Sequence, residues 1–388
     1  MNWELITAIV FYSILGILIY KNRSKFEWME RILLVHRTQW GISWMHKVAQ
    51  FWPLWKIWST FGIPVSVYFA LKIIVLLANN ALTIVAGTGG AGVALAIPGV
   101  KIPGSPIFIP FWYGIISIGV LAVVHEFAHG IIAAMEGVRL KSTGFGFLAV
   151  IPLAFVELDE EQIKDMPALV RMRISAAGAF ANISVYFIVM ILLTAFVTPF
   201  LSSLMQFQGV EITSVVGDKP AELAGISEGT VITSVNGNET PDLYSFVKTM
   251  SYVKPGDTVN FGTLNQTYTV NMAADPNNNS RAYMGVFLEQ VSEPTPEAKA
   301  KFGFLLSIML WFYGLFLWIA NLNLMIGVLN FLPIWILDGG RIFADLFGYV
   351  IKKREVLAFV INLLFAFVTA LLLFNLIGPL FKNFFYLL

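Results

Sequence analysis

Long apolar stretches separated by short polar breaks dominate the pattern of this 388-residue sequence. A helix needs roughly 20 predominantly apolar residues to cross a bilayer, and several stretches approach or exceed that length. We expect transmembrane helices at 3–20, 61–85, 111–135, 174–200 and 356–376, with a further one that begins near 304 and ends at a polar break. The pattern therefore predicts a polytopic α-helical membrane protein of about six spans.

Two segments depart from this pattern. Residues 208–290 are polar, rich in Gly and Asn and patterned like strands, as in a small soluble domain. The segment STGFGFLAVIPLAFVELDEE is apolar but too interrupted for a span, and predicts a strand pair or a re-entrant segment that lies against protein or a wet cavity. We expect four parts: N-terminal helices with a Trp-rich cytoplasmic loop (1–110), the first half of a membrane core (111–206), a soluble α+β domain (207–291) and the second half of the core (302–388).

Composition and loop charge extend this picture. The chain is 57% hydrophobic and 13% charged, carries a formal net charge of +1 and has no cysteine. Nucleic acid is therefore not an expected partner, and thiolate metal sites are excluded. Basic residues gather after the first, third and fifth spans, which places those loops in the cytoplasm and the N-terminus and soluble domain outside. The Trp-rich loop is expected to form an amphipathic helix on the membrane surface.

Three ionisable side chains interrupt the third span, in the segment VVHEFAHGII. His125 and His129 are four residues apart, so they share one helix face and can bind one Zn²⁺. Glu126 lies beside them, placed to take a proton from water, as in HExxH zinc hydrolases. A pair of structural histidines is the alternative. Ionisable groups deep in a span cost about 2.5–3.5 kcal/mol each on insertion scales and are usually functional, which favours the metal site, in the cytoplasmic half of the bilayer.

Catalytic zinc usually has three protein ligands, so a further acid is expected. Glu136 is on the same helix, seven residues after His129, so its carboxylate cannot easily reach a metal held by the two histidines. The acidic run at 157–161 is better explained as a solvated face. Asp338 sits in the apolar segment LDGG without an adjacent basic partner before Arg341. Such an acid favours a cation, which makes Asp338 the strongest candidate.

These motifs resemble the site-2 protease family of intramembrane zinc metalloproteases, which pairs HExxH in one span with N-x-x-P-x-x-x-x-D-G in a later one. NFLPIWILDG, from Asn330, matches every fixed position. The resemblance implies that Asp338 is the third zinc ligand and that Asn330 lies near the reacting carbonyl. A further family element, Gly178-Ala-Phe-Ala-Asn182, has Ala179 where the family commonly has Pro. It implies that Asn182 lines the substrate site.

The segment GFGFLAVIPLAFVELDEE resembles a family strand segment that helps to hold an extended substrate, which implies a substrate-binding role for Gly144 and Gly146. For the two asparagines, hydrogen bonding between helices, worth about 0.6–2 kcal/mol each, is the alternative that the residues alone leave open.

The soluble segment resembles a PDZ domain. KPAELAGISEGTVITSVNGNET predicts a short helix, a turn, a strand and a tight Asn-Gly turn; 241–250 would be the groove helix, and 284–286 is similar to the peptide-binding loop and strand. Such a domain either adds a substrate strand to an exposed edge or excludes bulky ectodomains. The enrichment in Gly and Asn, without an obvious anion-binding cluster, favours the size filter.

These observations together predict a zinc endopeptidase, integral to the cell membrane, that cleaves transmembrane segments of pre-trimmed, membrane-anchored regulators. A metal transporter is the rival class, but transporters usually show paired halves and repeated broken helices, which this sequence lacks. A catalytically inactive scaffold is a third hypothesis, and it would have no use for Glu126.

Overall fold

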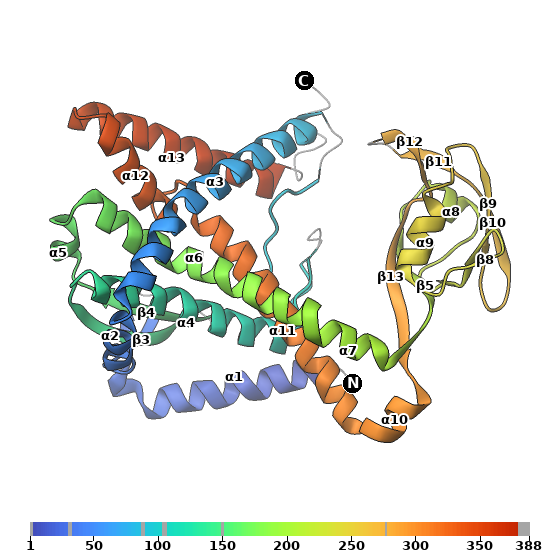
Figure 1. Cartoon of the computed structure of the whole chain (residues 1–388), viewed down its shortest axis with the longest axis horizontal. Helices are drawn as coiled ribbons and strands as arrows, with labels where there is room; N and C mark the ends of the chain where they lie inside the picture. The colour runs from blue at the N-terminus through green and yellow to red at the C-terminus, as the bar shows by residue number, and fades with distance from the viewer. Residues whose placement is uncertain are drawn as a thin grey trace. The chain divides into compact units, whose positions relative to one another are not determined.

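The computed structural model describes residues 3–29, 33–86, 90–102, 107–148, 151–275 and 278–378 (Figure 1). The chain divides into two compact units, and each is described by itself. The membrane unit comprises Met1–Leu193 and Phe312–Leu388, and the insert comprises Thr194–Trp311. The insert contains the segment predicted to be a soluble domain.

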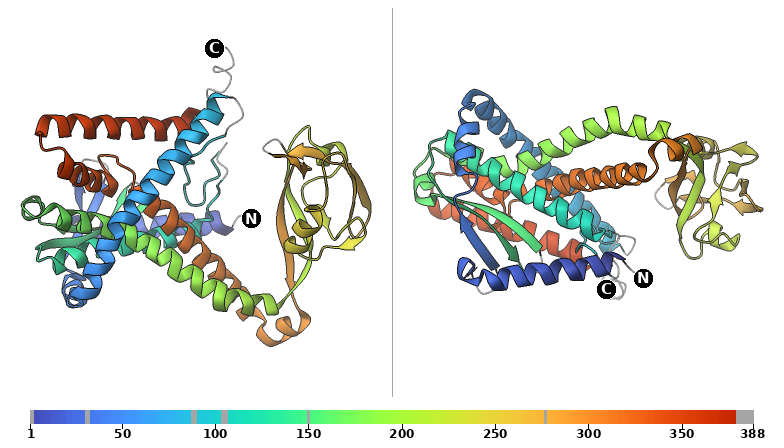
Figure 2. Two further views of the ribbon diagram at one scale, coloured as in Figure 1. Left: turned by 45° about the horizontal axis from the view of Figure 1, so that its top comes forward. Right: turned by 90° about the horizontal axis from the view of Figure 1, so that it is seen from below.

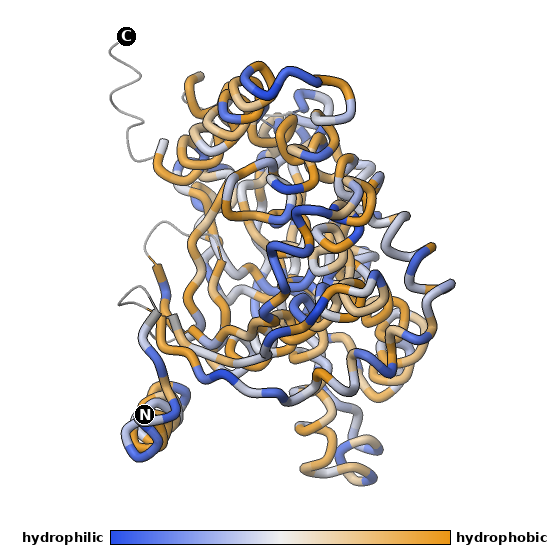
Figure 3. Tube along the Cα trace, turned by 90° about the vertical axis from the view of Figure 1, so that its left-hand side faces the viewer, coloured by the Kyte–Doolittle hydropathy of each residue, from blue (hydrophilic) through white to orange (hydrophobic). Residues whose placement is uncertain are grey.

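Within the described residues, 6 helical segments are long and apolar enough to cross a membrane. Hydrophobic positions predominate along the helices (Figure 3). The candidate spans are α1 (Trp3–Lys21), α3 (Trp52–Val85), α4 (Phe111–Met135), α6 (Ala168–Leu192) with its π-helical and α7 continuations (Leu193–Val197 and Thr198–Ser203), α11 (Phe304–Asn330) and α13 (Arg354–Ile377). The predicted bounds of α4 are confirmed. α3 begins nine residues earlier than the predicted 61, because Pro53 in its first turn is compatible with a helix start.

The Trp-rich segment does not form the single surface helix that was expected. It contains a 3₁₀ turn (Arg23–Lys25), strands β1 (Glu27–Met29) and β2 (Leu33–Thr38), the short helix α2 (Ile42–Ala49) and the start of α3. Gly41 has a φ of 85°, a conformation open mainly to glycine, and it turns the chain from β2 into α2. Trp40 and Trp44 each lie 5.8 Å from the ring of Phe127 on α4. This segment therefore packs against α4.

Helix α6 is at the centre of the membrane unit, in contact with α3, α4 and α12 (Asp338–Val350) (Figure 2). Its residues from Met172 to Ile183 are buried without interruption. Small residues make this possible, because Ser, Ala and Gly let neighbouring backbones approach closely. Those small buried residues are Ser175, Ala176, Ala177, Gly178, Ala179 and Ala181.

The predicted strand pair forms as β3 (Leu140–Leu148) and β4 (Ile151–Leu158). They belong to an antiparallel sheet with the order β1-β2-β3-β4, so β3 is an interior strand and β4 is an edge strand. β4 packs on α4, and the short helix α5 (Glu160–Lys164) follows it. The edge of the sheet thereby lies along the helix that carries HExxH.

The insert has a hydrophobic core of its own between small antiparallel sheets. Its elements are β5 (Met205–Val215), α8 (Pro220–Leu223), β6 (Val231–Ile232), β7 (Ser234–Val235), β8 (Asn238–Glu239), α9 (Leu243–Met250), β9 (Thr258–Gly262), β10 (Thr267–Asn271), β11 (Ala273–Asp275), β12 (Asn278–Tyr283), β13 (Val286–Pro294) and α10 (Pro296–Phe302). One sheet has the order β13-β5-β6, a second has the order β10-β9-β7-β8, and β11 pairs with β12. Asp242 caps α9 by accepting a hydrogen bond from the Ser245 N–H at 2.6 Å, and the Ser245 hydroxyl accepts one in return from the Asp242 N–H.

Candidate metal centre

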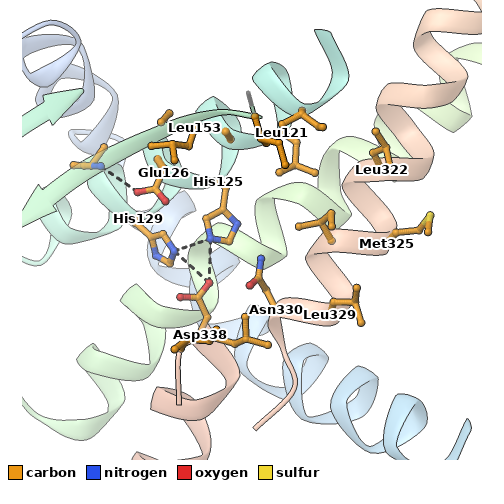
Figure 4. A pocket seen from close by; sticks show the side chains of 18 of the residues that line it. Leu121, His125, Glu126, His129, Leu153, Leu322, Met325, Leu329, Asn330 and Asp338 are labelled. Carbon is orange, nitrogen blue, oxygen red and sulfur yellow. Dashed lines mark hydrogen bonds and ion pairs between the residues drawn. The ribbon is translucent and has the colours of Figure 1, made fainter. Parts of the chain in front are cut away.

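Helix α4 presents its two histidines side by side, as their spacing predicted. The Nε2 atoms of His125 and His129 lie 3.2 Å apart and point in the same direction (Figure 4). Two nitrogens that bind one tetrahedral zinc at about 2.0–2.1 Å should be about 3.3 Å apart. The spacing therefore suits ligation of one ion.

Asp338 reaches the same point from a segment more than 200 residues away in the sequence. Its Oδ2 lies 3.1 Å from His125 Nε2 and 3.3 Å from His129 Nε2. That oxygen is buried and accepts no hydrogen bond from the described residues. A buried carboxylate oxygen that meets two imidazole nitrogens at this spacing is a set of ligands that fits a divalent cation.

The two glycines after Asp338 explain how it is delivered. A Cβ at Gly339 would lie 2.1 Å from the Phe331 carbonyl oxygen, and one at Gly340 would lie 2.2 Å from that of Ile334. Only glycine allows the first turn of α12 to pack this closely on the preceding turn. The Asp-Gly-Gly sequence therefore places the carboxylate at the start of α12.

Glu126 lies next to this group without belonging to it. The three atoms that lie within 4.8 Å of one another come from His125, His129 and Asp338. Glu126 Oε2 instead accepts a hydrogen bond of 3.1 Å from the N–H of Val156 on β4. Glu126 is thereby held beside the ligands, where its other oxygen is available to a proton.

A cavity of about 850 Å³ in the membrane unit contains this group. Glu126, Asn330 and the three candidate ligands line it, together with much of β4. Most of the remaining wall is apolar and comes from residues 94–96 and 109, from α4 and from α11; Leu121, Leu322, Met325 and Leu329 are examples (Figure 4). The cavity thus combines a few polar groups with an apolar wall.

A family model for peptidase family M50 matches residues 113–374, which include all of these site residues. The chain belongs to peptidase family M50. This is the site-2 protease family whose motifs the sequence resembles, so the family prediction is confirmed. M50 membership and the apolar helices make the chain an integral membrane metalloprotease.

Three proteins similar to this M50 peptidase come from different organisms. An uncharacterized protein of Methanocaldococcus jannaschii is 25% identical over 356 residues, 90% of this chain and 87% of that protein. A membrane-bound transcription factor site-2 protease homolog of Arabidopsis thaliana is 28% identical over 126 residues, 32% of this chain and 24% of that protein. A Clostridium perfringens protein named as a candidate zinc metalloprotease is 23% identical over 312 residues, 62% of this chain and 89% of that protein.

Solved structures similar to part of this M50 peptidase are PDZ domains of SdrC-like proteins. The domain from Listeria monocytogenes is 28% identical, with 21% of this chain and 88% of that chain covered and a TM-score of 0.19. The domain from Listeria innocua is 26% identical, with 21% and 93% covered and a TM-score of 0.19.

The other predicted site residues of the M50 peptidase lie in different surroundings. Asn330 ends α11 and lines the cavity. Asn182 is fully buried on α6 behind His125 and is not among the residues that line the cavity. Gly144 and Gly146 are on the interior strand β3, also away from the lining. A Cβ at either position would lie 2.4 Å from a carbonyl oxygen of β2, so these glycines have a packing role, and the structure does not bring them to the cavity.

Three of the acids that the sequence offered as alternative ligands are engaged elsewhere. Glu136 accepts a hydrogen bond of 2.9 Å from Arg173. In the acidic run, Glu157 accepts from Ser142 at 2.6 Å and Glu160 pairs with Arg341 at 3.2 Å. Sequence reasoning missed two backbone groups of the M50 peptidase, the Val156 N–H that binds Glu126 and the Ile174 carbonyl that binds His129 at 2.7 Å. Nearly every residue type has such groups, so the residue types at 156 and 174 could not have indicated them.

Proposed function

We propose that this M50 peptidase is an intramembrane zinc endopeptidase that cleaves transmembrane segments of other membrane proteins. The observation that carries the proposal is the meeting of His125, His129 and Asp338 in an apolar cavity within a unit of candidate membrane spans. Aliphatic walls suit the side chains of a transmembrane segment, which are themselves largely apolar.

When bound, a zinc ion supplies Lewis acidity, which polarises a carbonyl and acidifies water. Glu126 then acts as general base: it takes a proton from the attacking water and returns one to the amide nitrogen as the peptide bond breaks. The products are a carboxylate and an amine. The Val156 N–H holds one Glu126 oxygen, which leaves the other for the proton. The amide of Asn330 is proposed to donate a hydrogen bond to the oxyanion.

We propose that the open edge of β4 holds the substrate, because a helical segment must unwind before its carbonyls can be attacked. The Val156 N–H points away from β3, since it donates to Glu126. Backbone groups alternate along a strand, so those of Ala154 and Pro152 point the same way, and proline has no N–H. Ala154 can therefore pair with an extended substrate two residues from the group that holds Glu126.

A matched pair of variants tests the general base. Glu126→Gln should abolish cleavage of a transmembrane model substrate in proteoliposomes while keeping one zinc per chain. Glu161→Gln changes an exposed acid that does not line the cavity, and should cleave like the parent. Cleavage by Glu126→Gln at the parent rate would exclude Glu126 as the base, and zinc flux without cleavage would favour a transporter.

The proposed orientation places the insert outside the cell and the zinc site in the cytoplasmic half of the membrane, on the strength of loop charge. The chain has no cysteine, so single cysteines report accessibility cleanly. In intact cells an impermeant maleimide should label Asn265→Cys in the insert and leave Lys353→Cys unlabelled. The opposite result would reverse the topology.

We propose that the insert is a PDZ-like domain that filters substrates by size, so that only pre-trimmed membrane-anchored regulators reach the site. A hollow of about 600 Å³, lined by α9, β12 and the start of β13, is where the alternative, capture of a substrate peptide, would take place. Lengthening the extracytoplasmic part of a model substrate should slow cleavage by the parent and not by a variant without the insert. Equal slowing in both would count against the filter.

A further inference from the structure

Helix α6 contacts both ring nitrogens of each candidate ligand histidine. Ile174, Gly178 and Asn182 are spaced by four residues, so they form a stripe one turn apart on α6. The Ile174 carbonyl oxygen lies 2.7 Å from His129 Nδ1, and the Asn182 amide nitrogen lies 3.2 Å from His125 Nδ1. Between them, Gly178 faces the two Nε2 atoms. The stripe repeats the spacing of the histidines on α4.

The contact at His129 determines which of its nitrogens is free for a metal. A carbonyl oxygen can only accept, so Nδ1 carries the proton and donates to Ile174. Nε2 then keeps its lone pair and faces Asp338. This is the arrangement in which ligand histidines are oriented by an outer acceptor.

His125 needs the same arrangement, and Asn182 can provide it. For Nε2 of His125 to bind a metal, Nδ1 must be protonated and must find an acceptor. Asn182 is fully buried, and its Oδ1 accepts no hydrogen bond from the described residues. Turning the amide by 180° exchanges its oxygen and nitrogen. Oδ1 then accepts from the protonated His125 Nδ1, which leaves the lone pair of Nε2 free for a metal.

We propose that Asn182 is a positioning residue for His125, which holds the imidazole with Nε2 toward the metal, and that it does not contact substrate. The inference rests on the metal site of the proposed function. Together with the Ile174 carbonyl, Asn182 lets α6 fix both histidines, so that the metal site depends on the α4–α6 contact as well as on its own ligands.

Zinc affinity of the purified full-length protein tests this, by competition with a chromophoric chelator, which needs no peptidase activity. Asn182→Leu keeps a similar volume and removes the acceptor, so zinc should bind about 10- to 100-fold more weakly, the range found when outer partners of metal ligands are lost. Asn182→Asp restores an acceptor and should bind zinc at least as tightly as the parent. The matched control is Asn323→Leu, which changes a fully buried amide of α11 that does not line the cavity, and should leave zinc affinity unchanged.

Parent affinity in Asn182→Leu would overturn the proposal, as would Asn182→Asp binding zinc tenfold more weakly than the parent. If Asn182→Leu does not fold, the comparison of Asn182→Asp with the parent still decides the question. A parent protein that holds no zinc would overturn the proposed function and this inference together. If Asn182→Leu loses zinc affinity and Glu126→Gln still cleaves, Glu126 is not the base. The positioning role of Asn182 is then still supported.

Discussion

Replacing Gly178 by alanine should disrupt the metal centre from a helix that supplies no metal ligand. A Cβ at this position would lie 2.4 Å from His129 Nε2 and 2.7 Å from His125 Nε2, whereas ordinary contact begins near 3.4 Å. The His129 nitrogen would have to move by about 1 Å. Metal–ligand distances are tolerated to within about 0.2 Å, so a shift of that size is incompatible with the three-ligand site.

Helix α6 cannot retreat to relieve this contact. Ala176, Ala177 and Ala179, on its other faces, are completely buried, and α3 and α12 pack against the helix. The imidazoles must therefore move, and we expect Gly178→Ala to fold into the membrane while losing most of its zinc and its cleavage. Elemental analysis of the purified protein and cleavage of a transmembrane substrate measure the two effects.

Gly119→Ala is the matched control, on α4 itself. A Cβ at Gly119 meets nothing within 4 Å, and alanine is favoured over glycine inside a helix by up to about 1 kcal/mol. This variant should keep zinc and activity, with equal or slightly higher thermal stability. If Gly178→Ala retains a full equivalent of zinc and cleaves like the parent, the packing argument for the α6–histidine contact is wrong.

Three further predictions concern a ligand, the edge strand and the insert. Asp338→Asn should lower zinc retention after mild chelation, because a neutral amide is a poorer ligand than a carboxylate; unchanged stoichiometry would remove Asp338 from the site. Ala154→Pro should raise KM without loss of zinc, because it deletes one outward-facing N–H of β4. The strand already contains a proline at another outward-facing position, Pro152, so it should tolerate the change. An unchanged KM would argue against strand addition. Hydrogen bonds from Ser245 lower the pKa of Asp242, so the stabilisation that this cap contributes, typically about 1 kcal/mol, is present at neutral pH and lost as acid protonates the carboxylate. Hydrogen exchange of α9 in Asp242→Ala should thus differ from the parent at neutral pH and converge with it in acid, and a difference independent of pH would contradict the capping argument.

Much of the membrane unit could be predicted because a bilayer constrains sequence strongly. A span must be long, apolar and helical, so the pattern alone located α4 to the residue and the other spans to within a few residues at most ends. The histidines and Glu126 stood out because ionisable groups are rare at that depth. Asp338 could be proposed from its apolar surroundings and from a motif. Its distance from the two histidines could not be predicted from the sequence.

Only the tertiary structure decided which groups surround the metal site. The Gly178 contact, the Val156 and Ile174 backbone bonds and the position of Asn182 behind His125 all depend on how α4, α6 and β4 pack. Local sequence sets the period of a helix or strand but not the neighbour that it meets. The order of the sheet, which puts β4 at the edge and Gly144 and Gly146 inside, likewise follows from long-range pairing. The sequence thus determined the spans and the ligand types, and packing determined which of their atoms meet.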